Sequence, residues 1–185
     1  MSPLTAPPHP LAQVSLSLPD ASTTAALGCA LADALLAQRA HIEVHGFVLW
    51  LRGDLGTGKT ALVRAALRRL GVEGPVKSPT FTLLEPYVVS SLRFHHFDFY
   101  RFSDAAEFDA AGFRESFGAG CVCAVEWPER AQGRLPTADL SIALQVKDDG
   151  RVAHCVATSE AGAQCLQAMT ISMQQPPPSA AAADC

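Results

Sequence analysis

Apolar residues recur along most of the chain in short runs that glycine, proline and charged residues interrupt. Runs rich in β-branched and aromatic residues predict strands, and apolar residues spaced three and four apart predict helices. The expected strands are 14–18, 47–51, 82–89, 92–99, 121–125, 140–146 and 152–157. The expected helices follow Pro19-Asp20 as far as about residue 38 and then cover 61–70 and 161–169, with short surface helices within 104–117.

Two pairs of these strands are separated only by turn residues. Ser90-Ser91 separates the third strand from the fourth, and Asp148-Asp149-Gly150 separates the last two. Such short polar connections favour antiparallel hairpins. The remaining strands alternate with helices, so we expect an α/β fold with a mostly parallel central sheet flanked by helices, to which the antiparallel hairpins are added.

The ends of the chain differ in composition from its middle. Residues 1–13 contain several prolines and lack both a basic start and a continuous apolar stretch, so we expect an irregular leader that is not a secretion signal. Residues 171–185 are rich in glutamine, proline and alanine, which predicts a disordered tail. The total of 185 residues fits one domain, placed at 14–170.

Charge and composition exclude several functional classes. The net charge is −4 and only three lysines occur, which argues against strong direct binding of RNA or DNA. No apolar run approaches the roughly 20 residues of a membrane span. The six cysteines form no C-x-x-C pair, and we expect reduced thiols. These properties predict a cytoplasmic protein without membrane contact.

Residues 53–60, with the sequence GDLGTGKT, follow an expected buried strand and precede an expected helix. This octet matches the pattern G-x-x-x-x-G-K-[ST] of a phosphate-binding loop, or P-loop. Glycines let successive backbone N–H groups curl around a phosphate, the lysine reaches the outer phosphates and the hydroxyl ligates Mg²⁺. We therefore predict a P-loop NTPase-like fold. The predicted nucleotide-binding residues are Gly53, Asp54, Leu55, Gly56, Thr57, Gly58, Lys59 and Thr60.

Two segments downstream of the octet carry further candidate residues. Ser78 and Thr80 flank a proline about one helix length after the loop, where many P-loop folds sense the outer phosphate. Asp98 ends an expected strand, where it could orient the attacking water or hold a magnesium-bound water. From local sequence alone, a turn at Ser78-Pro79 and a cap or an Arg101 salt bridge for Asp98 are the alternatives.

The apolar run 121–125 ends in Glu126, as a Walker B strand ends in an acidic residue beside the P-loop magnesium. An ordinary surface glutamate at a strand end is the alternative. Trp127 follows directly and could pack over the nucleotide or shield the edge of the sheet.

The absence of asparagine and the scarcity of arginine in 104–120 narrow the choice of nucleotide and of reaction. The chain contains no asparagine, so it lacks the N-K-x-D guanine-reading motif of GTPases and ATP is favoured. A small-metabolite kinase would carry an arginine-bearing lid, yet 104–120 offers only Arg114. An ATPase is preferred, with a small-metabolite kinase and a non-hydrolysing nucleotide-binding module as alternatives.

Four blocks together closely resemble the bacterial TsaE family, at residues 53–60, 77–83, 96–101 and 125–129. Their order and spacing are also similar, and the resemblance spans about 18–159. It implies a P-loop α/β fold, binding of ATP and Mg²⁺, and slow intrinsic hydrolysis. It further implies a role in threonylcarbamoyladenosine modification of tRNA, with the TsaD and TsaB proteins as partners and with tRNA reached through that complex.

The resemblance also assigns roles to single residues. It implies that Mg²⁺ is held by Thr60 and Glu126, with catalytic roles for Lys59, Asp98 and Glu126. Ser78 and Thr80 match the switch-like segment of the family, and Trp127 matches the tryptophan after the acidic residue. Thr57 departs from the family pattern, since alanine is common there.

Overall fold

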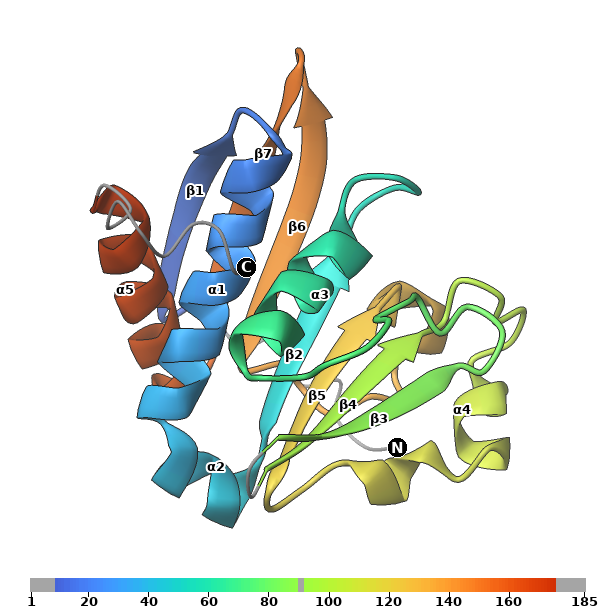
Figure 1. Ribbon diagram of the computed structural model, residues 1–185. Coiled ribbons are helices and arrows are strands. Elements are labelled where there is room, and N and C mark those ends of the chain that lie inside the picture. The colour runs from blue at the N-terminus through green and yellow to red at the C-terminus, as the bar shows by residue number, and fades with distance from the viewer. Residues whose placement is uncertain (1–8, 90–91, 176–185) are drawn as a thin grey trace.

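The computed structural model describes residues 9–89 and 92–175. Within them a seven-stranded sheet runs in the order β1-β7-β6-β2-β5-β4-β3 (Figure 1). The strands are β1 Ala12–Leu18, β2 Phe47–Arg52, β3 Leu84–Val89, β4 Leu92–Asp98, β5 Cys121–Glu126, β6 Leu140–Lys147 and β7 Gly150–Ala157.

The four central strands of this sheet are parallel. β2 pairs in parallel with β6 on one side and with β5 on the other, and β4 pairs in parallel with β5. β3 and β4 form one antiparallel hairpin, and β6 and β7 form the other. The predicted fold class is confirmed, and the parallel pairing brings the carboxyl ends of β2, β4, β5 and β6 to one edge of the sheet, where open α/β sheets bind ligands.

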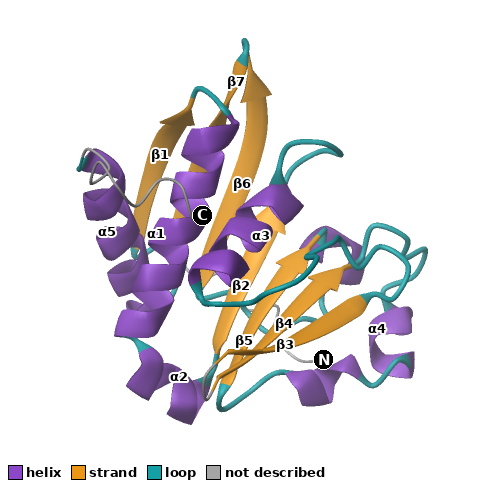
Figure 2. Ribbon diagram, viewed as in Figure 1, coloured by secondary structure: helices purple, strands orange, loops and turns teal. Residues whose placement is uncertain are grey.

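Helices cover the sheet unequally (Figure 2). On one face α1 packs between α3 and α5, and its first turn is closed by a capping box between Asp20 and Thr23. The helices are α1 Ala21–Ala37, α2 Arg39–His45, α3 Lys59–Arg69, α4 Ala106–Ala110 and α5 Glu160–Gln174, with 3₁₀ turns η1 Phe113–Ser116 and η2 Pro128–Ala131. α2 was not expected from the sequence, and α3 begins two residues before its predicted start.

The strand alternation divides the core between the two faces of the sheet. Alternate side chains, such as Leu49 and Leu51 of β2, point to α1, α3 and α5 and form the larger cluster. The other face carries an aromatic cluster around Phe97 and Phe99, covered by α4 and η1. Because Asp98 and Glu126 lie in the first set of positions, both carboxylates point to the face where α3 begins.

The ends of the domain differ from the predicted boundaries. β1 begins at Ala12, within the leader expected at 1–13. α5 continues through Gln174, so the boundary expected at 170 lies inside a helix and the expectation of disorder is wrong for 171–174. The physical reason is that Met169 is buried and Met173, one turn later, packs against the same core. Residues 1–8 and 176–185, where the remaining leader and tail predictions fall, lie outside the described residues.

Two predictions from composition have different outcomes. Cys121, Cys123, Cys155 and Cys165 are buried free thiols, whereas Cys29 is disulfide-bonded, so the expectation of six reduced thiols is wrong at Cys29. Sequence spacing alone does not show which cysteines meet in a fold, and this explains the error. None of the helices in 9–89 and 92–175 combines the length and apolar character that crossing a membrane requires.

Asp139 ties the P-loop strand to α5. Its Oδ2 accepts a hydrogen bond from the Val48 N–H at 2.8 Å, and its Oδ1 accepts one from the Ser159 hydroxyl at 2.6 Å. Replacing Asp139 with Ala should lower the free energy of unfolding by about 1–3 kcal/mol, because the part-buried Val48 N–H and the Ser159 hydroxyl both lose their acceptor. Urea unfolding checks this. Glu73→Ala, at an exposed carboxylate, serves as the control and should change stability by less than about 0.5 kcal/mol; equal effects in the two variants would contradict the role of Asp139.

Candidate functional site

The loop between β2 and α3 has the geometry that the octet predicts. It follows the buried strand β2, and α3 begins at Lys59 with its amino end at the loop. Gly53, Gly56 and Gly58 adopt φ values of 129°, 81° and 106°, which favour glycine. A Cβ at Gly53 would also overlap the carbonyl oxygen of Leu144. The strand, loop and helix context required of a P-loop is present.

The side chain of Lys59 folds back across this loop. Its Nζ donates to the carbonyl oxygens of Gly53 at 2.6 Å and Asp54 at 2.9 Å, and lies 4.3 Å from the ring centroid of Trp127. Burial lowers the pKa of Lys59, against the opposing effects of Glu126 and Asp98. The amine therefore lies among backbone carbonyls and an aromatic face, with two carboxylates nearby. A phosphate bound in the loop would form a direct ion pair with it.

The carboxylate of Glu126 is buried at the end of β5 and held from two sides. Thr60 donates its hydroxyl to Oε1 at 2.8 Å, and the ring Nε2 of His96 lies 2.8 Å from the same oxygen. His96 is fully buried on β4. In the part of the chain that the structure describes, Oε2 of Glu126 takes no hydrogen bond. Two partners thus orient this carboxylate through one oxygen and leave the other available.

Asp98 lies next to Glu126 in the β4–β5 register and binds a different segment. Its Oδ2 accepts hydrogen bonds from the hydroxyls of Ser78 and Thr80, the latter at 2.7 Å, and its Oδ1 accepts one from the Tyr100 N–H at 3.0 Å. The sequence left a capping contact or an Arg101 salt bridge as structural alternatives for Asp98. The hydrogen bond from the Tyr100 N–H is a local backbone contact of the capping kind. No Asp98–Arg101 ion pair occurs among the described residues; the Arg101 guanidinium lies instead 4.2 Å from the Phe81 ring centroid.

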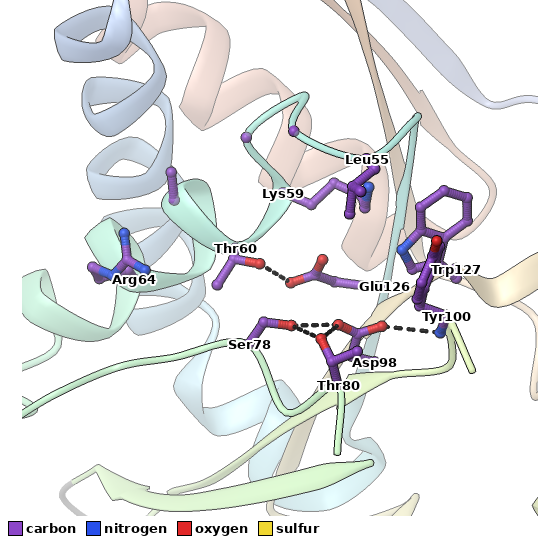
Figure 3. Close-up of a pocket in the computed structure, with 13 residues that line it drawn as sticks. Leu55, Lys59, Thr60, Arg64, Ser78, Thr80, Asp98, Tyr100, Glu126 and Trp127 are labelled. Atoms are coloured by element: carbon purple, nitrogen blue, oxygen red, sulfur yellow. Dashed lines mark hydrogen bonds between the residues drawn. The ribbon is translucent and has the colours of Figure 1, made fainter. Parts of the chain in front are cut away.

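These groups surround a cavity of about 330 Å³ (Figure 3). Figure 3 shows the Thr60 hydroxyl pointing at the Glu126 carboxylate and the Ser78 hydroxyl pointing at the Asp98 carboxylate, each joined to it by a hydrogen bond. The predicted site residues that line the cavity are Leu55, Gly56, Gly58, Lys59, Thr60, Ser78, Thr80, Asp98, Glu126 and Trp127. Residues predicted from separate stretches of the chain are therefore brought together.

Three predicted loop residues do not line the cavity. Gly53 and Asp54 hold the Lys59 amine through their carbonyl oxygens. The Thr57 hydroxyl turns back to the Asp54 carbonyl oxygen at 2.9 Å and is buried. Arg114, the one arginine of 104–120, is exposed and donates to Asp109.

Sequence reasoning missed four residues of the site. Ala61, Arg64 and Tyr100 line the cavity, and His96 lies behind Glu126. A helical count from Thr60 would have found Arg64, since residues four apart share a helix face. Strand alternation from Asp98 would have found His96. Arg64 donates through Nε to the Val76 carbonyl oxygen at 2.8 Å, which keeps it against the segment that leads to Ser78.

The residues present fit a magnesium-bound nucleotide. The loop admits no Cβ at Gly53, and its three glycines adopt the positive φ values that suit a loop curled around a phosphate. A hydroxyl and a carboxylate oxygen, the ligand types that Mg²⁺ prefers, meet at Thr60 and Glu126. The site can therefore stabilise negative charge at one end and hold a hard cation at the other.

Comparison with known proteins adds independent information. A family model described as "Threonylcarbamoyl adenosine biosynthesis protein TsaE" matches residues 18–153. The tRNA threonylcarbamoyladenosine biosynthesis protein TsaE of Haemophilus influenzae is 37% identical over 153 residues, which cover 83% of this chain and 95% of the relative. The protein of the same name from Treponema pallidum is 40% identical over 106 residues, covering 57% of this chain and 77% of the relative. The crystal structure of Bacillus subtilis YdiB superposes with a TM-score of 0.70 at 27% identity, covering 88% of this chain and 97% of that one.

Two glycines of the loop provide a matched test of its geometry. Gly53→Ala should destabilise the protein more than Gly56→Ala, because a Cβ overlaps the Leu144 carbonyl at Gly53 and meets nothing within 4 Å at Gly56. At Gly56 only the strain of the backbone conformation remains, about 1–3 kcal/mol. Thermal unfolding of both variants measures the difference. If both variants lose the same stability, the close approach of β6 to Gly53 does not constrain the loop.

Proposed function

The chain belongs to the TsaE family of threonylcarbamoyl adenosine biosynthesis proteins, and we propose that it is a MgATP-binding, partner-dependent ATPase required for threonylcarbamoyladenosine modification of tRNA. One observation carries the proposal. The P-loop lysine, the Thr60 hydroxyl and two buried carboxylates from neighbouring parallel strands converge on a single cavity.

In this proposal the loop and Lys59 bind the β and γ phosphates. Backbone N–H groups of 53–60 and the amino end of α3 face the anion, and the Lys59 amine exchanges its carbonyl partners for phosphate oxygens. Thr60 and Glu126 hold Mg²⁺, directly or through water. Once bound, MgATP supplies the phosphorus that is attacked and the cation that neutralises its oxygens.

Asp98 has a different role in this mechanism. It positions the hydrolytic water or couples the state of the nucleotide to the partner, because it holds Ser78 and Thr80 of the neighbouring segment through hydrogen bonds. A nucleotide that competes for these hydroxyls would release the segment 77–83, which includes the exposed Phe81. In this mechanism most of the rate acceleration comes from Lys59, the loop N–H groups and the cation, which stabilise the negative charge on the phosphate oxygens in the transition state.

The proposed partners are TsaD and TsaB, with tRNA bound through the complex. Relatives named as tRNA threonylcarbamoyladenosine biosynthesis proteins support the pathway. The net charge of −4 agrees with indirect contact to tRNA. We propose slow intrinsic hydrolysis that the partners accelerate, and a cytoplasmic location.

Product analysis tests this function against the alternatives. The purified protein is incubated with MgATP, alone and with TsaD, TsaB and tRNA, and released phosphate is measured. Phosphate release that rises with the partners supports the ATPase. Labelled phosphate on a metabolite would identify a kinase, and tight ATP binding without release under every condition would identify a non-hydrolysing module.

Lys59→Ala should weaken MgATP binding at least about tenfold and abolish hydrolysis, because a charge-assisted contact to phosphate is lost. Calorimetric titration and phosphate release measure the two effects. Lys147→Ala, at an exposed lysine of β6, is the matched control and should leave both unchanged. Wild-type hydrolysis in the Lys59 variant would remove this lysine from the site.

Glu126→Gln should raise the Mg²⁺ concentration needed for half-maximal hydrolysis by at least about tenfold, because an amide oxygen carries no charge for the cation. Glu129→Gln, three residues along and paired with Arg52 on the surface, controls for the loss of a carboxylate. An unchanged magnesium titration in the Glu126 variant would move the metal role to Asp98, which Asp98→Asn would then test.

A further inference from the structure

His96 is a polar residue in a row of β4 that packs into the core. Strand alternation directs Phe94, His96 and Asp98 to the face that carries the larger core cluster, and Phe94 belongs to that cluster. His96 is fully buried, and its register partner on β5 is the core residue Ala124. Apolar side chains usually occupy such positions, so the presence of an imidazole needs a physical reason.

One nitrogen of this imidazole has a partner and the other has none. The Nε2 atom lies 2.8 Å from Oε1 of Glu126, whereas Nδ1 is buried without a hydrogen-bond partner among the described residues. A buried polar atom that stays unpaired is unfavourable. An apolar residue at position 96 would avoid this cost, so the hydrogen bond through Nε2 is the contact that accounts for a histidine here.

The direction of this hydrogen bond follows from the acceptor. A carboxylate that holds a metal ion is ionised and can only accept, so the Nε2 atom of His96 carries the hydrogen and donates it to Glu126. The Thr60 hydroxyl donates to the same oxygen at 2.8 Å. Two donors on Oε1 fix the plane of the carboxylate and leave Oε2 for a ligand in the cavity that Glu126 lines.

Thr60 and His96 differ in what each can do once a metal ion is bound. In the proposed function the Thr60 oxygen is itself a ligand of Mg²⁺, so its hydroxyl has to serve two partners. His96 lies behind the carboxylate on β4 and is not among the residues that line the cavity. Its hydrogen bond to Glu126 is therefore the one that does not depend on the state of the metal site.

We propose that His96 is a positioning residue for the magnesium site. Its Nε2–H holds the Glu126 carboxylate in one orientation in the empty protein, so that the oxygen offered to Mg²⁺ is already in place. This role rests on the proposed function, because it requires that Glu126 holds Mg²⁺ directly or through water. It adds a residue that raises the affinity for the metal ion without touching the metal ion or the nucleotide.

Two substitutions at position 96 separate the hydrogen bond from packing. His96→Gln keeps an N–H donor, and His96→Met fills the space without a donor. His95→Met is the matched control, because this adjacent histidine is half-buried on the opposite face of β4, where its Nδ1 lies 2.9 Å from the Ser116 carbonyl oxygen. Calorimetric titration measures binding of a non-hydrolysable ATP analogue with excess Mg²⁺ and with a chelator that removes the metal.

The affinity that the analogue gains from Mg²⁺ should fall about tenfold in His96→Met, the lower end of the effect of removing a hydrogen bond to a metal ligand, while metal-free binding changes less than about twofold. His96→Gln should restore most of the gain, and His95→Met should match the wild type. Equal weakening with and without Mg²⁺ in His96→Met would show a structural role and overturn the assignment. A gain in His96→Gln as low as in His96→Met would also overturn it.

The effect must also depend on Glu126. In a Glu126→Ala background, His96→Met should change the gain from Mg²⁺ less than about twofold further, because no carboxylate remains to be positioned. The full effect of His96→Met in that background would mean that His96 acts by another route, and would overturn the assignment.

Nitrogen NMR of the metal-free protein tests the hydrogen bond directly. The His96 ring, identified by the loss of its signals in His96→Gln, should carry its hydrogen on Nε2. A ring with hydrogen on Nδ1 alone could not donate to Glu126 and would overturn the assignment. If His96→Met fails to fold, by its melting curve, this measurement on the wild type decides the outcome.

Failure of the proposed function would look different. A wild-type protein that does not bind the analogue, or binds it equally well with and without Mg²⁺, would exclude the proposed nucleotide or metal site itself. Metal-dependent binding that His96→Met leaves unchanged would keep that site and exclude only the positioning role of His96.

Discussion

The parallel register of β4 and β5 is the constraint on which the site depends. It sets Asp98 beside Glu126, two buried carboxylates on adjacent strands, at the edge where α3 begins. Buried carboxylates are unfavourable unless hydrogen bonds satisfy them. Each therefore recruits donors from elsewhere, Glu126 from α3 and β4 and Asp98 from the segment before β3. The requirement to satisfy two carboxylates thus links three parts of the chain that are distant in sequence.

This linkage explains how one small cavity could both bind a nucleotide and report its presence. Thr60 joins the P-loop helix to Glu126, and Ser78 and Thr80 join a connecting segment to Asp98. The same segment presents Phe81, 83% exposed, to the surface. In the proposed function, a nucleotide that competes for these hydroxyls would release that segment, and a partner protein would then meet a surface that depends on the nucleotide. In the proposed switch, the sheet positions the two carboxylates and the segment 77–83 responds to the ligand.

Local sequence patterns were sufficient to predict the strand, loop and helix around residues 53–60. The need for glycine in a loop and the burial of a strand both depend on only a few neighbouring residues. Glu126 was likewise predicted from one apolar run that ends in an acid. Longer-range features were missed: the sequence analysis did not pair His96 with Glu126 and did not place Arg64 at the cavity. The predicted helix that corresponds to α5 was also too short. The glutamines and prolines after Met173 suggested disorder, and the sequence does not show that Met173 packs against the core.

By itself the sequence determined the P-loop, the α/β class, the two hairpins and the residues that carry charge, because these follow from backbone conformation and from the period of side-chain burial. Only the tertiary structure decided which of those residues meet. The strand order places β5 and β4 on one side of β2 and β6 and β7 on the other, and that order depends on packing between distant segments. It gathers the two carboxylates of β4 and β5 beside the loop 53–60, an arrangement that no local pattern contains.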